Sequence, residues 1–437
     1  MMRRDAHAPT LRWMMTFATP SVNPNWRLNS YLFLLSQFVT GITSMVVQYG
    51  IVWYLTQQSG SATVLSLATL TAMLPMVLLS PFVGTFIDRW NKKALLIVPD
   101  MVAAAAAIVL SVVGTVDGDF PLWLVFGSLL VRSGAQAFQS PTVQSILPTM
   151  VPQGEITKIN GTLGMVQSAT MVISPALGAL LYAFIPINLL ILLDVLGAVL
   201  GLAVLMFVTI QSNQSAVSRR PHVWADTVFG FKRIGTVRGL WAIVLINALF
   251  SLLFMPAASL YPLMTLQYFR GTIAQAGIVE VVWSAGSLAG GAIIGVFGAT
   301  RDRMIPTVAG MGLLGVAFVA CAVLPREMTG FVVFVALNAV AGLAASFPFT
   351  LTMAMIQESF PADELGRVFG VVMSLSNLAG PIGLLFAGPL GDAIGVQWVF
   401  ALSGLGAVLC AVLMAAVPDC RDYDLRLQDK KAATQTM

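Results

Sequence analysis

Besides Asp100, which lies one to two helical turns into its stretch, three ionisable residues interrupt long apolar stretches of this sequence: Arg132, Asp194 and Glu280. A charged side chain in such a stretch loses its hydration, so it is rare there unless it serves a function. A carboxylate in this setting can take up a proton from one side and release it to another. Asp194 and Glu280 are therefore candidates for proton coupling.

Each of the three residues also has a second interpretation. Asp194 could brace its helix against the preceding one through a hydrogen bond, and Glu280 could pair with a cationic amine of a ligand. Arg132 could be satisfied by backbone carbonyls and by neighbours such as Gln136 or Gln167. The sequence leaves these alternatives open.

The composition indicates that these residues lie in segments surrounded by lipid. The chain has 437 residues, of which 57% are hydrophobic and 10% charged, and its mean hydropathy is +0.86. Twelve segments are long and apolar enough to cross a bilayer as helices. They cover 29–56, 62–87, 94–116, 121–148, 159–185, 187–210, 239–262, 275–298, 305–325, 329–356, 366–391 and 396–418. This predicts an all-α membrane protein, with Pro186 separating the fifth and sixth helices.

The spans divide the chain into two six-helix halves, at 28–210 and 239–418. Tails at 1–27 and 419–437 flank the halves, and residues 211–238 link them. The linker begins polar, as a solvated segment would, and continues as "VWADTVFGFKRIGTVRG", whose apolar and basic residues alternate at helical spacing. This pattern favours an amphipathic helix at the membrane surface.

Basic residues indicate the orientation. Of the 23 Lys and Arg residues, all but Arg132, Arg270 and Arg326 fall in segments that the twelve-span prediction places on one side. Because cytoplasmic loops are enriched in Lys and Arg, both termini are predicted to be cytoplasmic. The first 26 residues contain no continuous apolar run, so a cleaved signal peptide is not expected.

The two halves also resemble each other. The segment "SPTVQSILPTMVPQGEITKINGTL" (140–163) and the segment "FPFTLTMAMIQESFPADELGRVFGVV" (347–372) occupy equivalent places in the two halves. Pro141 then pairs with Pro348, and Glu155 with Glu364. Such weak internal symmetry is typical of transporters built from duplicated halves.

The loop "GTFIDRWNKKALL" (84–96), between the second and third spans, resembles the signature of the major facilitator superfamily. Asn91 stands where that family usually has a second glycine. The stretches "VRSGAQAFQSPTVQSILP", "SPALGALLY" and "ELGRVFGVVMSLSNLAGPIGL" are similar to the macrolide-efflux branch. The resemblance implies a bacterial cytoplasmic-membrane exporter that exchanges protons for amphiphilic drugs. Export of a siderophore or another amphiphile, or a non-transporting receptor of the same fold, remains open.

The resemblance also implies roles for particular residues. Arg132 would assist proton transfer by stabilising the charge of a carboxylate. Pro175 and Gly178 would bend the fifth helix or let its neighbour approach. A cytoplasmic gate would comprise Gly84, Asp88, Arg89, Lys92, Lys93 and Asp100, with a second-half counterpart at Glu364, Gly366 and Arg367. In it Asp88 and Arg89 would form a latch, Lys92 and Lys93 would anchor the topology, and Asp100 would pair with the loop arginine.

A roomy apolar cavity with a few polar anchors suits a bulky amphiphile. The candidates for its wall are Gln37, Gln48, Tyr49, Trp53, Asn247, Phe250, Phe254 and Asn338.

The residues that several other functions require are absent from the sequence. No Gly-Lys pair is present, so the chain has no phosphate-binding loop, and a separate ATPase subunit stays an open possibility. Neither histidine, His7 or His222, lies in a predicted span, which excludes a histidine relay. The three cysteines lack paired spacing. We therefore expect no metal, no cofactor, no enzymatic activity and no nucleic-acid partner.

Overall fold

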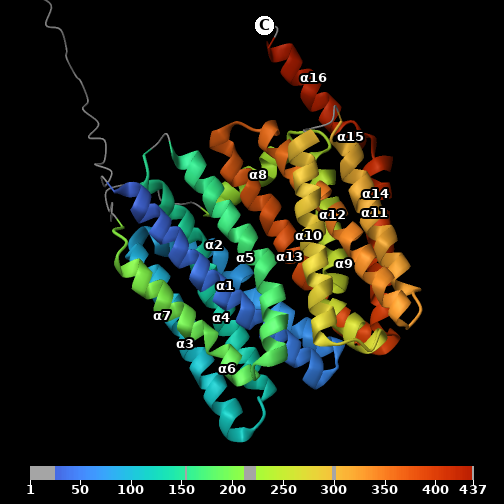
Figure 1. Cartoon of the computed structure of the whole chain (residues 1–437). Coiled ribbons are helices and arrows are strands. Elements are labelled where there is room, and N and C mark those ends of the chain that lie inside the picture. The colour runs from blue at the N-terminus through green and yellow to red at the C-terminus, as the bar shows by residue number, and fades with distance from the viewer. Residues whose placement is uncertain (1–24, 153–154, 211–222, 298–301, 436–437) are drawn as a thin grey trace, which may run out of the picture.

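The computed structural model describes residues 25–152, 155–210, 223–297 and 302–435, and for some helical residues, including 84–89, the backbone alone. The described residues fold into a bundle of long helices without strands (Figure 1). This confirms the predicted all-α architecture.

The N-terminal half consists of the first seven helices. They are α1 (Trp26–Ser59), α2 (Ala62–Arg89), α3 (Lys92–Asp117), α4 (Leu122–Met150), α5 (Ile156–Phe184), α6 (Ile187–Ile191) and α7 (Leu193–Met206). The predicted sixth span is thus broken at Leu192 into α6 and α7, and Pro186 lies at the N-terminal cap of α6.

A helix, α8 (Val223–Gly235), lies within the predicted linker. The C-terminal half follows. It contains α9 (Leu240–Leu263), its π-helical extension η2 (Met264–Tyr268), α10 (Ile273–Phe297), α11 (Met304–Ala322), α12 (Met328–Ser359), α13 (Ala362–Ile394) and α14 (Val396–Ala416). Two helices, α15 (Pro418–Arg421) and α16 (Tyr423–Gln435), end the chain.

Eleven helices of the described chain are long and apolar enough to cross a membrane, counting α6 and α7 together. The exception among the twelve predicted spans is α4, which has 29 residues but carries Arg132 and several glutamines. It packs between α2 and α3 along the bundle. α4 is therefore long enough to cross a membrane, and it differs from the other spans in its higher polarity.

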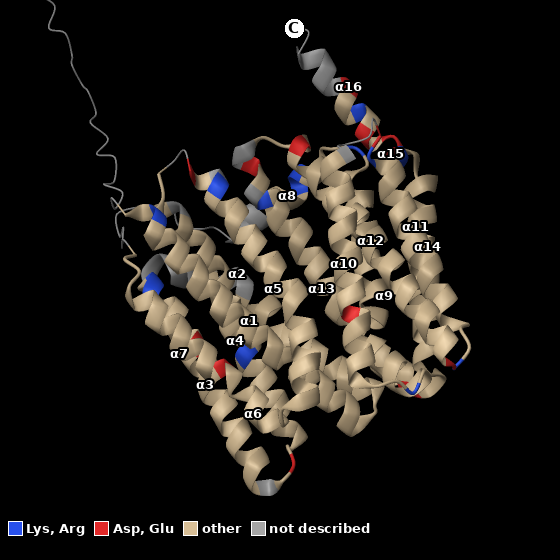
Figure 2. Ribbon diagram, viewed as in Figure 1, with Lys and Arg blue, Asp and Glu red and all other residues tan. Residues whose placement is uncertain are grey.

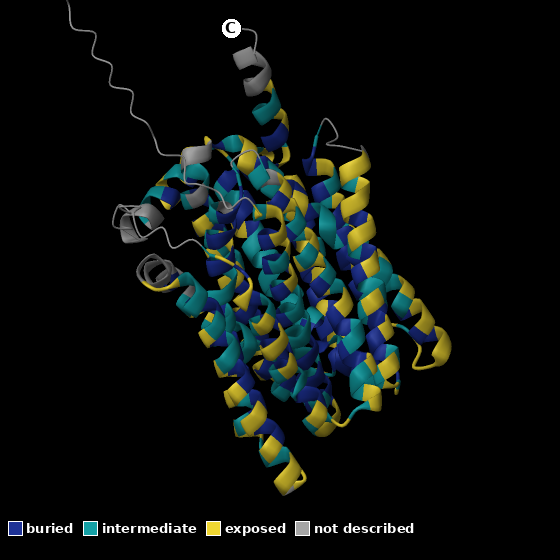
Figure 3. Ribbon diagram, turned by 60° about the vertical axis from the view of Figure 1, so that its left-hand side comes forward, coloured by how far each residue is buried: buried dark blue, intermediate teal, exposed yellow. Residues whose placement is uncertain are grey.

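The outer surface of the bundle is apolar. Exposed residues run along the outward faces of the helices (Figure 3), and large side chains among them, such as Phe184, Phe207 and Val296, are each 79% exposed. In water such a continuous apolar surface would be strongly unfavourable. Since helices satisfy their own backbone hydrogen bonds, lipid can cover this surface without penalty.

The two ends of the bundle differ in charge. We call the end that carries α8, α15 and α16 the linker end and the opposite end the far end. Charged residues gather at the linker end, whereas the middle of the bundle is almost free of them (Figure 2). This distribution agrees with the predicted placement of the basic residues on one side.

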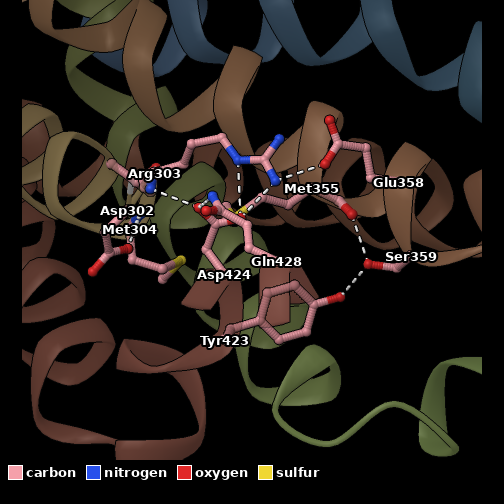
Figure 4. A network of polar contacts seen from close by, with 10 residues as sticks. Asp302, Arg303, Met304, Met355, Glu358, Ser359, Tyr423, Asp424 and Gln428 are labelled. Atoms are coloured by element: carbon pink, nitrogen blue, oxygen red, sulfur yellow. Dashed lines mark hydrogen bonds and ion pairs between the residues drawn. The ribbon is translucent and has the colours of Figure 1, made fainter. Parts of the chain in front are cut away.

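A buried ionic network holds the last helix against the linker end (Figure 4). Arg303, which is 4% exposed, donates through Nε to Oδ1 of Asp424 at 2.9 Å and contacts Glu358 at 2.7 Å. Tyr423 and Ser359 share a further hydrogen bond of 2.6 Å. Burial lowers the pKa of Arg303, but the carboxylates of Glu358 and Asp424 outweigh it and raise that pKa overall. The network thereby ties α16 to α11 and α12.

Candidate functional site

A cavity of about 1760 Å³ lies between the two halves. Its wall comes from α1, α2, α4 and α5 on one side and mainly from α9 and α13 on the other. It extends to Phe231 of α8 and to Arg367, at the linker end of α13. The Phe231 side chain is exposed, so the cavity reaches the surface at the linker end. This volume is large enough for a drug-sized molecule.

The two halves converge toward the far end. Along α2 and α13 the cavity separates residues such as Met76 and Ser374. Nearer the far end the same helices touch, because Ala62 and Leu65 of α2 belong to one hydrophobic core with Ala387 of α13. The cavity is therefore open at the linker end and closed at the far end.

A set of polar contacts fastens the far end. Asp392 of α13 accepts hydrogen bonds from the Ala62 amide at 2.7 Å, the Thr63 amide at 3.0 Å and the Ser61 hydroxyl at 2.9 Å. Gln267 of η2 donates to the carbonyl of Gly60. The first amides of a helix have no partner within it and carry a partial positive charge. A carboxylate of the C-terminal half thus caps the N-terminus of α2 in the other half; we call these contacts the far-end clasp.

The clasp requires a glycine. A β-carbon at Gly388 would lie 2.6 Å from the Thr63 α-carbon and 3.2 Å from the Ala62 carbonyl oxygen. We therefore expect Gly388→Ala to push the halves apart at the far end. Ser66, which is 1% exposed at this contact, can report it as Ser66→Cys. Thiol labelling of that cysteine should be faster in the Gly388→Ala protein, and the native cysteines should add little signal because all three are buried.

Gly291→Ala provides the matched control, since a β-carbon at Gly291 of α10 meets nothing within 4 Å. Both substitutions raise helix propensity by a similar amount. Equal labelling of the introduced cysteine in the two proteins would show that Gly388 does not set the closure of the far end.

Arg132 and Asp194 form a buried pair behind the cavity wall, and both bond to Ser44 of the wall. Arg132 is 2% exposed and Asp194 4% exposed, and the two side chains form an ion pair. Arg132 also donates to the Ser44 carbonyl at 2.7 Å, and the Ser44 hydroxyl donates to Asp194 at 2.9 Å. These contacts link α4 and α7 to α1. Arg132 thus uses a backbone carbonyl, as one alternative had it, but pairs with Asp194 in place of Gln136 or Gln167. Asp194 does brace its helix through a hydrogen bond, but against α1 and not the fifth helix.

Glu280 lies at the contact between the halves. The Tyr49 hydroxyl of α1 donates to its carboxylate at 3.3 Å. Tyr49 packs in a cluster with Trp53 and Tyr261, whose rings meet edge to face at 6.0 Å. Tyr261 lies within electrostatic reach of Glu280. Because α1 and α10 belong to different halves, the Tyr49–Glu280 hydrogen bond depends on how the halves are arranged.

A third intramembrane carboxylate, Asp100 of α3, accepts a hydrogen bond from Gln139 of α4. Ser44, Tyr49 and Gln139 all line the cavity. Of the described residues in the cavity wall, none is acidic. The carboxylates of Asp100, Asp194 and Glu280 are thus separated from the cavity by a neutral wall residue that donates a hydrogen bond to each.

At the linker end, the residues predicted as the second gate contact α8. Glu364 accepts from Arg233 at 2.5 Å, and Arg367 stacks on the Phe229 ring at 3.8 Å. The surroundings of Gly366 lie outside the described side chains. Because Phe231 also stacks on Trp241 of α9, α8 is attached to the C-terminal half.

The first gate is only partly described. The side chains predicted to form it at Gly84, Asp88 and Arg89 lie outside the described part, so the latch remains a prediction. Lys92 and Lys93 donate to the carbonyls of Ser145 and Val208.

Near the gate, Asn91 caps α3 by accepting from the Lys93 amide at 2.8 Å. This gives the residue that departs from the family pattern a local role.

Gly178 fits the predicted close approach of the fifth helix. A β-carbon at Gly178 would lie 2.8 Å from the Tyr49 β-carbon and 3.2 Å from the Val46 carbonyl oxygen. Pro175 lies within the continuous helix α5. Gly178 therefore lets α5 pack directly on the segment of α1 that carries Tyr49.

The structure corrects part of the predicted cavity wall. Gln37, Gln48 and Tyr49 line the cavity, whereas the other five candidates do not. These are Trp53, Asn247, Phe250, Phe254 and Asn338. Trp53 is completely buried, and Phe250 and Phe254 belong to an aromatic stack inside the C-terminal half. The two asparagines instead donate to carbonyls of their own helices.

Most polar residues of the cavity wall were not among the predicted wall residues. Gln139 and Asn377 line the cavity, as do Gln136 and Gln167, which were considered only as partners for Arg132. Gln136 and Gln139 lie three residues apart on α4, so they share a helix face. This polar stripe on an otherwise apolar helix was the available signal.

The sequence model of the Major Facilitator Superfamily matches residues 33–268 and 243–433, which together cover most of the chain. The chain belongs to the major facilitator superfamily. Macrolide efflux protein A of Streptococcus pyogenes is 34% identical over 403 residues, which is 92% of this chain and 99% of that protein. Multidrug efflux pump Tap of Mycobacterium bovis is 27% identical over 390 residues, 86% of this chain and 90% of the pump.

A solved structure supports the same fold. The nucleoside transporter NupG superposes with a TM-score of 0.69 at 11% identity, over 89% of this chain and 100% of that one. The superfamily fold explains the two halves around a central cavity. The chain is thus a multi-pass protein of the bacterial cell membrane.

Proposed function

We propose that this superfamily member exports amphiphilic drugs, macrolides among them, in exchange for protons. Its similarity to macrolide and multidrug efflux proteins supports the substrate class. The observation that carries the mechanism is a cavity open at one end only, with Glu280 hydrogen-bonded across the contact between the halves.

In this proposal the linker end faces the cytoplasm, and drug enters the cavity there. Opening of the far end separates α1 from α10 and exposes Glu280 to external water, from which it takes up a proton. Burying a neutral carboxyl beside Tyr49 and Tyr261 costs less than burying a carboxylate. Protonation therefore favours closure of the far end. The proton later leaves Glu280 for cavity water through the Tyr49 hydroxyl.

Inside-out membrane vesicles test the proposal. An inside-acid pH gradient, imposed without ATP, should drive uptake of labelled erythromycin, and a protonophore should abolish it. Vesicles that carry no transporter are the control. Uptake that persists with the protonophore would contradict proton coupling. Absence of uptake by folded protein would contradict macrolide export and favour a siderophore or another amphiphile as the substrate.

A further inference from the structure

The cavity wall is mostly apolar and almost uncharged, with side-chain amides set into it. Five glutamines reach it from α1, α4 and α5, and methionines supply much of its apolar surface. The glutamines are Gln37, Gln48, Gln136, Gln139 and Gln167, and the methionines are Met45, Met73, Met76, Met171 and Met373. Among the described wall residues Arg367 alone carries a charge, and it is positive.

The nearby carboxylates are not part of the described cavity wall, so a ligand in the cavity does not contact them directly. Glu280 is covered by Tyr49, Asp100 by Gln139, and Asp194 by Ser44 and its ion pair with Arg132. A cation that enters the cavity would lose hydration without finding an exposed carboxylate. At the mouth it would also pass the guanidinium of Arg367.

Several amides of the wall are instead available for hydrogen bonds. The side chains of Gln48, Gln136 and Gln167 make no hydrogen bond to another described residue. Each amide offers two N–H donors and a carbonyl acceptor. A large ligand that carries hydroxyl and carbonyl groups on an apolar frame matches amides set among methionines, because thioether side chains adapt to irregular shapes.

We propose that the cavity binds its substrate uncharged, as a hydrogen-bonding amphiphile, and that a weakly basic drug enters as its free base. The inference rests on the proposed export function and specifies the substrate class for the same cavity. It has an electrical consequence. Exchange of a neutral molecule for protons moves net charge, so a membrane potential alone should drive transport.

Binding to purified, reconstituted protein tests the inference separately from transport. The probe is a labelled erythromycin derivative whose tertiary amine has lost one methyl group and is then acetylated, so that it is a neutral amide. Its competitor is erythromycin methylated to a quaternary, permanently charged ammonium. We expect the quaternary compound to compete at least about tenfold more weakly than unlabelled acetylated compound.

A charged variant provides a second readout. Gln136→Glu places a carboxylate on the wall with little change of shape, so it should improve competition by the quaternary compound about tenfold. Gln57→Glu is the control, since Gln57 lies outside the cavity wall on α1 and accepts a hydrogen bond from Tyr182.

Equal competition by the two compounds, or failure of the acetylated compound to bind, would overturn the inference. So would a Gln136→Glu protein that gains nothing over Gln57→Glu. Selective binding of the neutral compound without uphill uptake would leave the inference intact and contradict the proposed export function.

Discussion

Glu280→Gln is expected to abolish uphill accumulation of drug while leaving drug binding intact. The amide cannot carry a proton, but it keeps the shape of the side chain and can still accept a hydrogen bond from Tyr49. Arrangement of the halves would then no longer depend on protonation. In vesicles with an inside-acid gradient, labelled erythromycin should reach only its equilibrium level, whereas exchange between labelled and unlabelled drug should continue.

Asp100→Asn is the matched control for this prediction. Asp100 is also a carboxylate behind the cavity wall, but it and its partner Gln139 both belong to the N-terminal half. Its hydrogen bond therefore need not change when the halves move, and accumulation should persist. Loss of accumulation in Asp100→Asn together with retention in Glu280→Gln would reverse the assignment of the coupling residue.

Arg132→Gln is expected to produce the largest loss of stability. It leaves Asp194, which is 4% exposed, as a buried carboxylate with only the Ser44 hydroxyl as its described partner. Removing one member of a buried ion pair typically costs about 3–5 kcal/mol. Thermal unfolding of the purified protein in detergent should therefore begin at a clearly lower temperature.

The double variant Arg132→Gln/Asp194→Asn distinguishes charge from packing. With both charges removed, the Asn side chain can still accept from Ser44, so most of the lost stability should return. Lys158→Gln, at an exposed position, should change stability by no more than about 0.5 kcal/mol. A single Arg132→Gln variant as stable as Lys158→Gln would show that the ion pair contributes little.

These predictions separate two carboxylates that the sequence treats alike. Asp194 and Glu280 both stand alone in apolar stretches, and either satisfied the pattern expected of a proton site. In the structure Asp194 is paired within the N-terminal half, whereas Glu280 bonds across the halves. The difference arises from the tertiary arrangement, in which side chains connect α4 with α7 and α1 with α10. No spacing along the chain encodes either contact.

The residues of the cavity wall were likewise only partly predictable from the sequence. Gln37, Gln48 and Tyr49 were found because polar residues on an apolar span have few other roles. Asn247 and Asn338 fitted the same criterion but donate to carbonyls of their own helices and do not line the cavity. A helix has several faces, and only its neighbours decide which of them meets the cavity. The far-end clasp was missed for this reason, since Asp392 and the N-terminus of α2 are more than three hundred residues apart.

The sequence by itself determined the membrane class, the helices and the superfamily. Apolar length and composition act locally through the bilayer, and the loop "GTFIDRWNKKALL" is a contiguous motif. Tertiary structure alone decided which carboxylates are paired, which side chains line the cavity and which end is closed. These properties depend on contacts between distant helices, where a neutral tyrosine, serine or glutamine covers each acid from another helix.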